Sequence, residues 1–344
     1  MSIPTELQNL IQVHLSEIET DIRLLKGDGS DRQIYLITGK KDQSKQIVGI
    51  YHEDLEENRD FLEITGQMAK IGLPVPKTLA VSGDKSCYLQ EYLGEKNLAE
   101  QLDEWRDAGE PIEKTISAYQ RVLDYLPKIQ RELPPLTSTV ISKRVMNKAA
   151  FLNDIQYFET NFVKRFGFSE FFTEDVRAEL LQELINPLDQ LDRDYFVYRD
   201  FQSRNIMWRD DHPVFIDYQS AYRGSLYYDL ASMLYASKSG LDEDARNVLI
   251  EYYYKIGNFS WAFETFQRDL YRFVVLRRLR SLGSYGYLSM EKGKMYFLDG
   301  IQPTLKELLL LFDTRSVLSR FQKLKEMIQA FDASWEEKSE SITS

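Results

Sequence analysis

The segment from residue 197 to residue 230 constrains this chain most, because two short motifs in it bring three oxygen-bearing side chains close together. In YRDFQSRN, four residues separate Asp200 from Asn205. In VFIDYQ, three apolar residues suit a buried strand, and Asp217 follows where that strand would end. Asp200 can orient a hydroxyl and accept its proton, and Asn205 and Asp217 can hold Mg²⁺ on nucleotide phosphates. The spacing predicts a phosphoryl-transfer site.

The order of these motifs follows the protein-kinase pattern H-R-D-x-x-x-x-N and then D-F-G. Tyr198 replaces the histidine and Tyr218-Gln219 replace Phe-Gly, at positions that pack rather than react. The alternative is that the two aspartates are ordinary turn carboxylates, which are common where a chain reverses. Arg199 and the downstream segment YYDLAS favour the functional interpretation.

Composition indicates a cytoplasmic enzyme that binds neither nucleic acid nor membrane. The net charge of −11 disfavours a broad phosphate-binding surface. No apolar run approaches the ~20 residues that span a bilayer, and the N-terminus lacks the pattern of a signal peptide. The single Cys87 excludes an internal disulfide framework, and the sequence leaves the oligomeric state open.

The first 93 residues predict a small antiparallel sheet with two helices. Helical spacing covers 4–20, and the segments expected as strands are 22–38 with a turn inside it, 45–51, 73–81 and 87–93; a helix is expected over 56–72. Within the turn, Gly29 and Ser30 are candidates to cover a phosphate, with Arg32 adding a guanidinium. An ordinary hairpin turn is the alternative.

We interpret Gln90, Glu91 and Leu93 as part of a hinge whose backbone would hydrogen-bond a nucleotide base. Because such backbone contacts need no particular side chain, the sequence does not distinguish adenine from guanine. Beyond it the chain is predicted to be mostly helical, over 113–130, 143–166, 176–191, 241–257, 262–282 and 303–331. The predicted domains are 1–93 for the nucleotide, 94–335 for the catalytic loop and acceptor, and a polar, frayed tail over 336–344.

Taken together, the loop, the hinge, YRDFQSRN, FIDYQ and YYDLAS resemble the aminoglycoside phosphotransferase and choline kinase superfamily over most of the chain. The resemblance implies an α+β, protein-kinase-like bilobal fold, ATP and Mg²⁺ as cofactors, and a small-molecule acceptor. Softer motifs, among them VPKTLA and FLNDIQYFETNF, are similar to the bacterial N-acetylmuramate/N-acetylglucosamine anomeric kinases of cell-wall recycling.

Carried over to this sequence, the resemblance implies that Asp200 is the base, with Asn205 and Asp217 on the metal. Asp229 then ties the catalytic loop to its neighbours, and Arg199 supports the site; a simple helix N-cap is the alternative for Asp229, and the two roles are compatible. Asp154, Tyr157 and Gln202 would face the acceptor; for the helix that carries Asp154, packing without ligand contact is the alternative.

One departure affects the mechanism. Protein kinases place a lysine on the third strand to hold the phosphates and pair it with a helix glutamate, but IVGIY contains none. Arg32 is the candidate substitute, with an exposed strand charge as the alternative, and Glu57 is expected to lose its ion-pair role. For Arg277, Arg278 and Arg280 we favour a solvated or salt-bridged helix face over a basic wall of the active site.

Two classes of function follow. The first is a small-molecule kinase, with an amino sugar favoured over an aminoglycoside or a choline-like alcohol as acceptor. The second is a non-catalytic nucleotide-binding module, which the missing lysine supports and the intact Asp200, Asn205 and Asp217 oppose.

Overall fold

The computed structural model describes residues 3–16, 19–25 and 32–343. Their contacts form two compact units, one of 1–143 with 203–221 and one of 144–202 with 222–344. The predicted boundary near residue 93 falls inside the first unit. No helix within the described ranges is both long and apolar enough to cross a bilayer.

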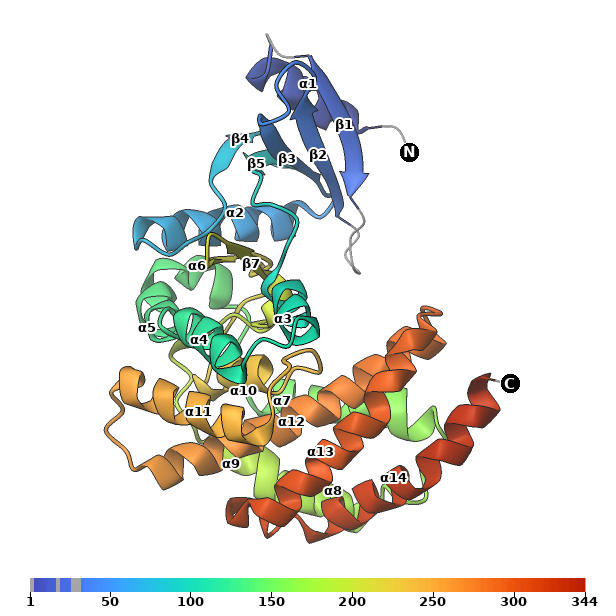
Figure 1. Ribbon diagram of the computed structural model, residues 1–344. Coiled ribbons are helices and arrows are strands. Elements are labelled where there is room, and N and C mark those ends of the chain that lie inside the picture. The colour runs from blue at the N-terminus through green and yellow to red at the C-terminus, as the bar shows by residue number, and fades with distance from the viewer. Residues whose placement is uncertain (1–2, 17–18, 26–31, 344) are drawn as a thin grey trace. The chain divides into compact units, whose positions relative to one another are not determined.

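The first unit contains a five-stranded antiparallel sheet in the order β1-β2-β3-β5-β4 (Figure 1). Its strands are β1 (Thr20–Leu25), β2 (Gln33–Gly39), β3 (Gln46–Tyr51), β4 (Thr78–Val81) and β5 (Cys87–Glu91). Helix α1 (Thr5–His14) packs against β3, β4 and β5. The helix predicted over 4–20 is shorter than expected, because Thr20 pairs with Gly39 at the edge of the sheet.

Helix α2 (Leu55–Lys70) forms largely as predicted. Asp54 caps it by accepting from the N–H groups of Glu56 and Glu57, at 3.0 Å each. The chain leaves the helix through Gly72, whose φ of +72° suits a residue without a Cβ. The capped first turn fixes the backbone of Glu57.

The remainder of the first unit is mostly helical, and the region predicted as one helix over 113–130 divides before Pro127. The elements are α3 (Leu98–Asp107), α4 (Ile112–Leu123), α5 (Leu126–Leu136), α6 (Ser138–Ile141), the 3₁₀ turn η3 (Ser203–Asn205), and the hairpin of β7 (Ile206–Arg209) and β8 (His212–Phe215).

The second unit is helical apart from one strand pair, so the predicted division into an antiparallel sheet and a helical remainder is confirmed. The pair is β6 (Tyr195–Val197) and β9 (Tyr222–Gly224). The helical elements are α7 (Lys148–Phe158), η1 (Glu159–Lys164), α8 (Glu174–Glu179), η2 (Leu180–Ile185), α9 (Asn186–Asp189), α10 (Tyr227–Leu234), α11 (Glu243–Gly257), α12 (Phe263–Met290), η4 (Met295–Gly300), α13 (Ile301–Thr314), η5 (Ser316–Leu318) and α14 (Gln322–Thr343).

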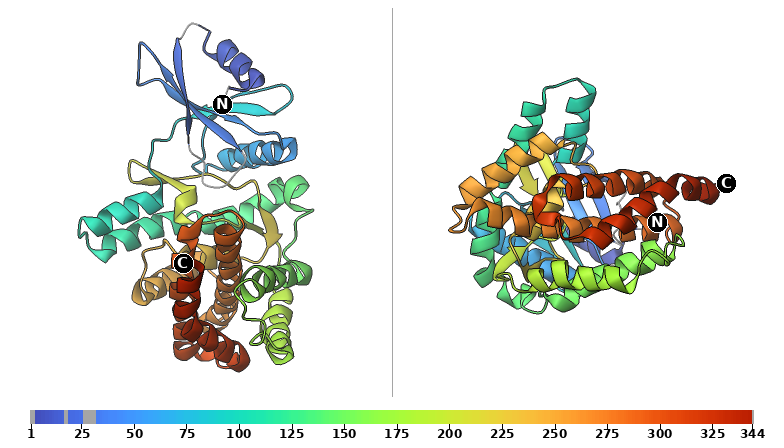
Figure 2. Two further views of the ribbon diagram at one scale, coloured as in Figure 1. Left: turned by 90° about the vertical axis from the view of Figure 1, so that its right-hand side faces the viewer. Right: turned by 90° about the horizontal axis from the view of Figure 1, so that it is seen from below.

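Helices α13 and α14 contact each other and follow one another in the chain through η5 (Figures 1 and 2). Because η5 separates the two helices, residues 303–331 do not form the single helix predicted from their apolar spacing. Helix α14 extends through the polar tail to Thr343. Buried Trp335 holds the helix on the second unit, and the lysine and glutamate residues beyond it favour helix.

Helix α12 packs very closely on the end of α7 and on the π-helical segment η1. A Cβ on Gly283 would lie 2.8 Å from the ring of Tyr157, and one on Gly286 would lie 1.9 Å from the carbonyl oxygen of Asn161. The two glycines therefore permit a helix approach that no larger residue would allow. This approach sets the side chains of α7 directly beside those of α12.

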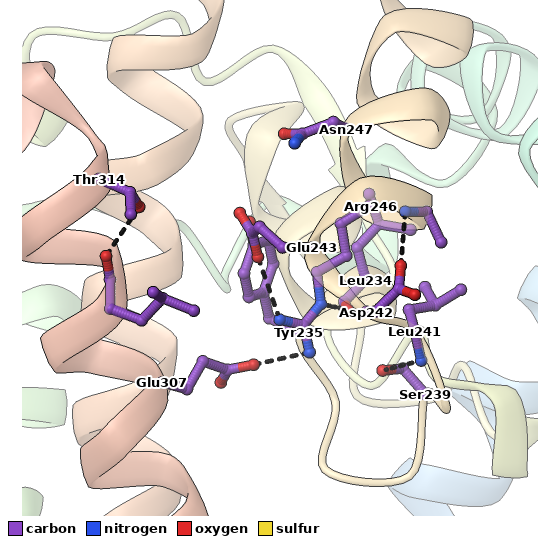
Figure 3. Close-up of polar contacts among 12 residues, drawn as sticks. Leu234, Tyr235, Ser239, Leu241, Asp242, Glu243, Arg246, Asn247, Glu307 and Thr314 are labelled. Carbon is purple, nitrogen blue, oxygen red and sulfur yellow. Dashed lines mark hydrogen bonds and ion pairs between the residues drawn. The ribbon is translucent and has the colours of Figure 1, made fainter.

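A buried ion network holds the C-terminal end of α10 (Figure 3). Arg246 donates from Nε to the carbonyl oxygen of Leu234 at 3.1 Å and pairs with Glu307 at 2.6 Å. Glu307 also pairs with the Nε of Arg278 at 2.7 Å, and Arg278 donates to the carbonyl of Tyr235 at 2.6 Å. The ion pair of Arg278 agrees with the predicted salt-bridged face, whereas the burial of its side chain excludes a solvated one.

Candidate active site

The loop after β6 is fixed by a buried carboxylate on α10. Asp229 is fully buried and accepts hydrogen bonds from the backbone N–H groups of Tyr198, at 2.8 Å, and Arg199, at 3.0 Å. Arg199 has a φ of +78°, which is costly for a residue with a Cβ. The two hydrogen bonds hold the loop in this strained form just before Asp200. Asp229 lies in the first turn of α10, where Leu226 occupies the N-cap position.

Burial dominates the electrostatics of Asp229. It raises the pKa of this carboxyl from 3.8 to about 7, against the lowering effects of the two N–H groups and of Arg277, while Asp200 raises it further. Because the folded protein binds the proton more tightly than the unfolded chain, Asp229 favours folding most at acid pH. That contribution is lost as the pH rises from about 4 through about 7.

We therefore expect Asp229→Asn to change the pH dependence of stability. The free energy of unfolding of the wild type, relative to that of the variant, should fall by up to ~1.4 kcal/mol per pH unit between about pH 4 and pH 7. Urea unfolding at a series of pH values measures this difference. Curves that stay parallel across that interval would show that Asp229 does not titrate there.

Asn205 and Asp217 meet at one end of the β7–β8 hairpin. Its register pairs Ile206 with Phe215, so Asn205 precedes one strand and Asp217 follows the other. The backbone N–H of Ile216 donates to the carbonyl oxygen of Asn205 at 3.2 Å and continues the pairing by one step. The hairpin thus brings the backbones of Asn205 and Asp217 to the same end of one strand pair within the first unit.

Asp217 itself has a φ of +68° and accepts a hydrogen bond from the Gln219 amide at 2.8 Å. The next residue, Tyr218, is fully buried, and its hydroxyl lies 2.6 Å from that of Thr65 on α2. The expectation that Tyr218 packs rather than reacts agrees with this placement.

The expectation that Glu57 loses its ion-pair role is wrong. Arg32 and Glu57 form an ion pair at 2.9 Å, and the Arg32 side chain is only 7% exposed. An exposed strand charge is therefore excluded for Arg32. Sequence reasoning missed the pair because the two residues lie 25 positions apart and only the fold of the sheet on α2 brings them together.

An aromatic stack connects this ion pair to Asp217. Phe61 on α2 stacks on Tyr88 of β5 and on Tyr218, with ring centroids 5.4 and 5.0 Å apart, and the Arg32 guanidinium lies 5.5 Å from the Phe61 ring. Burial raises the pKa of Tyr88, and the charges of Arg32, Glu57 and Asp217 all act on its hydroxyl. The charges of Arg32, the candidate substitute for the strand lysine, and of Asp217, the candidate metal ligand, thus act on the same tyrosine.

The predicted hinge residues lie at the end of β5 in the first unit. Gln90 is buried within the strand, and its amide nitrogen has no hydrogen-bond partner among the described residues. Glu91 accepts from the N–H of Lys77 at 2.8 Å, and Leu93 is half-buried just beyond the strand. Gly29 and Ser30 lie outside the described residues.

On the second unit, Asp154 and Tyr157 of α7 both contact Arg280 of α12. The Nε of Arg280 lies 3.1 Å from a carboxylate oxygen of Asp154, and its guanidinium lies 3.6 Å from the centre of the Tyr157 ring. Burial raises the pKa of Asp154 against the opposing charges of Arg280, Arg277 and Arg199. Gln202 is half-buried in the loop that follows Asp200.

Tyr228 and Arg277 complete this group and were not predicted as site residues. Arg277 donates to the Tyr228 hydroxyl at 2.5 Å and to Ser232 at 2.9 Å. The charges of Asp154, Arg199, Asp200 and Arg277 all act on the Tyr228 hydroxyl. Arg277 is thus held by α10 and interacts with the charge of Asp200, and its place in a basic wall of the active site stays a prediction. The three-residue spacing of Arg277 and Arg280, which puts both on one helix face, was the available signal.

Comparisons with known proteins agree with this arrangement. A family model described as the phosphotransferase enzyme family matches residues 21–264. The chain is 22% identical over 294 residues to an N-acetylmuramate/N-acetylglucosamine kinase of Pseudomonas aeruginosa, which covers 81% of this chain and 77% of that protein.

Solved structures show the same fold at low sequence identity. The ADP-bound aminoglycoside phosphotransferase APH(2'')-Ib matches with a TM-score of 0.58 and 15% identity, over 95% of this chain and 99% of that one. A choline/ethanolamine kinase family protein from Mesorhizobium loti matches with a TM-score of 0.59 and 12% identity, over 93% and 98%. The predicted protein-kinase-like fold is confirmed.

Proposed function

We propose that this chain, which belongs to the phosphotransferase enzyme family, is an ATP-dependent kinase that phosphorylates the anomeric hydroxyl of an amino sugar. Family membership confirms the resemblance predicted from the loop motifs. In this proposal residues 1–93 bind the nucleotide and residues 94–335 carry the catalytic loop and the acceptor. The enzyme would act in the cytoplasm on sugars released from the cell wall.

The arrangement around Asp200 supports the reaction. Asp229 anchors the backbone immediately before Asp200 through two N–H groups, so the carboxylate that accepts the hydroxyl proton stands on a fixed loop. Phosphoryl transfer depends on positioning and charge more than on covalent chemistry. A rigid base is therefore the element that this reaction most requires of the protein.

The donors on the hairpin suit Mg²⁺. The part of the chain that the structure describes holds no group of three or more His, Cys, Asp or Glu residues able to bind a metal by themselves. Kinase sites instead hold Mg²⁺ with one or two protein oxygens and the phosphates of the nucleotide. Asn205 and Asp217 would supply these oxygens, and Mg²⁺ would neutralise charge on the phosphates. Gly29, Ser30, Arg32 and the backbone at Gln90, Glu91 and Leu93 would hold ATP.

The likeness to the N-acetylmuramate/N-acetylglucosamine kinase carries the choice of acceptor, because it extends over most of both chains. Aminoglycosides and choline-like alcohols are the competing acceptors, and a nucleotide-binding module without activity is the competing class. Asp154, Tyr157 and Gln202 would face the acceptor.

An acceptor screen tests the proposal. Purified protein, ATP and Mg²⁺ would be incubated in parallel with N-acetylmuramate, N-acetylglucosamine, choline or kanamycin, and ADP release would be measured. We expect release only with the amino sugars, and none when EDTA removes the metal. Release with kanamycin or choline alone would contradict the acceptor. ATP binding without release in any reaction would contradict the kinase.

Replacing Arg32 with alanine is expected to raise the KM for ATP about tenfold and to lower kcat less, since a charged hydrogen bond to phosphate contributes ~1.5 kcal/mol or more. Glu57→Gln should shift the KM in the same direction by releasing Arg32 from its partner. Steady-state kinetics with varied ATP measures both. The control is Arg59→Ala, which changes an exposed arginine on α2, the helix of Glu57. An equal effect of Arg59→Ala on the KM would contradict the role of Arg32.

A further inference from the structure

Arg277 and Arg280 form a pair of guanidinium groups on one face of α12. They are three residues apart, so Arg280 lies about 4.5 Å further along the helix axis than Arg277. Arg277 is held by Tyr228 and Ser232, and Arg280 by Asp154 and the ring of Tyr157. Because both are fixed by neighbours in the second unit, their remaining donors have defined positions.

Each of the two groups keeps a donor atom that the protein does not use. The Nε of Arg277 and the Nη1 of Arg280 are buried and have no hydrogen-bond partner among the described residues. A buried donor without an acceptor is costly, particularly on a charged group, so such atoms indicate a bound water, ion or ligand. Because the two donor atoms lie on one helix face, a single ligand can accept hydrogen bonds from both.

The charges around these donors favour an anion. The group contains three arginines and two acids. The charges of Arg199, Arg277, Asp154 and Asp200 act on the Tyr228 hydroxyl, and Arg280 pairs with Asp154. Burial raises the pKa of Asp154 and so disfavours its negative charge. Asp229, a third acid that interacts with Arg277 and Asp200, likewise has its negative charge disfavoured by burial, so the three arginines outweigh the carboxylates on a protein whose net charge is −11. Guanidinium groups bind carboxylate or phosphate oxygens with two parallel hydrogen bonds.

We infer that Arg277 and Arg280 bind a carboxylate on the acceptor, so that the preferred substrate is an acidic amino sugar rather than a neutral or cationic one. This inference rests on the proposed function and names two specificity-determining residues for it. Arg277 interacts with the charge of Asp200, and Asp200 would accept the proton of the reacting hydroxyl. Arg280, one helical turn away, would bind an acidic substituent on the same sugar ring.

A matched pair of acceptors tests the inference. N-acetylmuramate carries a lactyl carboxylate that N-acetylglucosamine lacks, and we expect its kcat/KM to be at least ~10-fold higher with the wild type. In Arg280→Gln this preference should fall to within about threefold. Arg280→Lys, which keeps the charge but not the fork, should retain part of it. Because both acceptors are measured on one preparation, their ratio does not depend on the fraction of folded enzyme.

Arg268→Gln is the control, since Arg268 is a half-exposed arginine on the same helix, about 18 Å along the axis from Arg280. It should keep the wild-type preference. A third acceptor, N-acetylglucosamine 6-phosphate, distinguishes the anions, and a preference for it over N-acetylmuramate would overturn the carboxylate assignment.

Equal turnover of the acidic and neutral sugars by the wild type would overturn the inference and leave the proposed kinase intact. The same holds if Arg280→Gln slows both sugars by an equal factor, because Arg280 would then only support the helix contact. Turnover of neither sugar would overturn the proposed acceptor and the inference together.

Discussion

Asp200→Asn is expected to lower kcat for sugar phosphorylation by ~100-fold to ~10,000-fold, the range typical of a positioned general base. Asparagine has nearly the same shape but cannot accept the hydroxyl proton. The hydrogen bonds from Tyr198 and Arg199 to Asp229 do not involve this side chain, so the loop should keep its conformation. ADP release at saturating ATP and sugar measures the loss, and the KM for ATP should change only a few-fold.

Asp194→Asn provides the matched control. It removes an acidic group whose side chain is 81% exposed, six residues before Asp200 on the entry to β6. Its kcat should stay within about twofold of the wild type, as surface substitutions away from a site usually have small effects. An Asp200→Asn enzyme that retained a tenth or more of the wild-type rate would contradict the assignment of the base.

Asp217→Asn is expected to reduce turnover by ~100-fold or more at millimolar Mg²⁺, because removing a charge that stabilises the phosphates has effects of that size. Asparagine is preferred to alanine for this test. The φ of +68° at this position is tolerated by asparagine and strained for alanine, so the backbone is preserved. Gln219 can still donate to the new side chain.

The measurement is the dependence of turnover on Mg²⁺ concentration. The variant should require more Mg²⁺ and recover part of its rate at high concentration, whereas a purely structural defect would not respond. Asp210→Asn, at the tip of the same hairpin and 89% exposed, should behave as the wild type. Wild-type activity and metal dependence in Asp217→Asn would contradict the metal assignment.

The local parts of the site could be predicted from the sequence because they follow from short spacings. Four residues between Asp200 and Asn205, and an apolar run before Asp217, indicate a loop and a strand end from short spacings, whereas the strained form of the loop depends on the distant Asp229. The five-stranded sheet and the helical remainder follow from periodicity in the same way. The end of α1 was overestimated because the apolar spacing continues into β1.

The long-range pairs could not be predicted in this way. Arg32 finds Glu57 only once the sheet packs on α2, and Arg280 finds Asp154 only because Gly283 and Gly286 let α12 approach α7. Neither contact leaves a periodic signal in the chain. Arg277, Arg278 and Arg280 likewise have different partners because different elements pack against each face of α12. Arg278 joins the ion network at the C-terminal end of α10, while Arg277 contacts Tyr228 and Ser232 of α10 and Arg280 contacts α7.

We expect Asp200 to orient the anomeric hydroxyl of an amino sugar for attack on the γ-phosphoryl group of ATP. The most direct measurement is ³¹P NMR of the product formed from N-acetylmuramate, ATP and Mg²⁺ by the wild type and by Asp200→Asn. We expect an acid-labile sugar 1-phosphate with the wild type and at least ~100-fold slower product formation with the variant. Phosphate on another hydroxyl, or equal product from the two proteins, would contradict it.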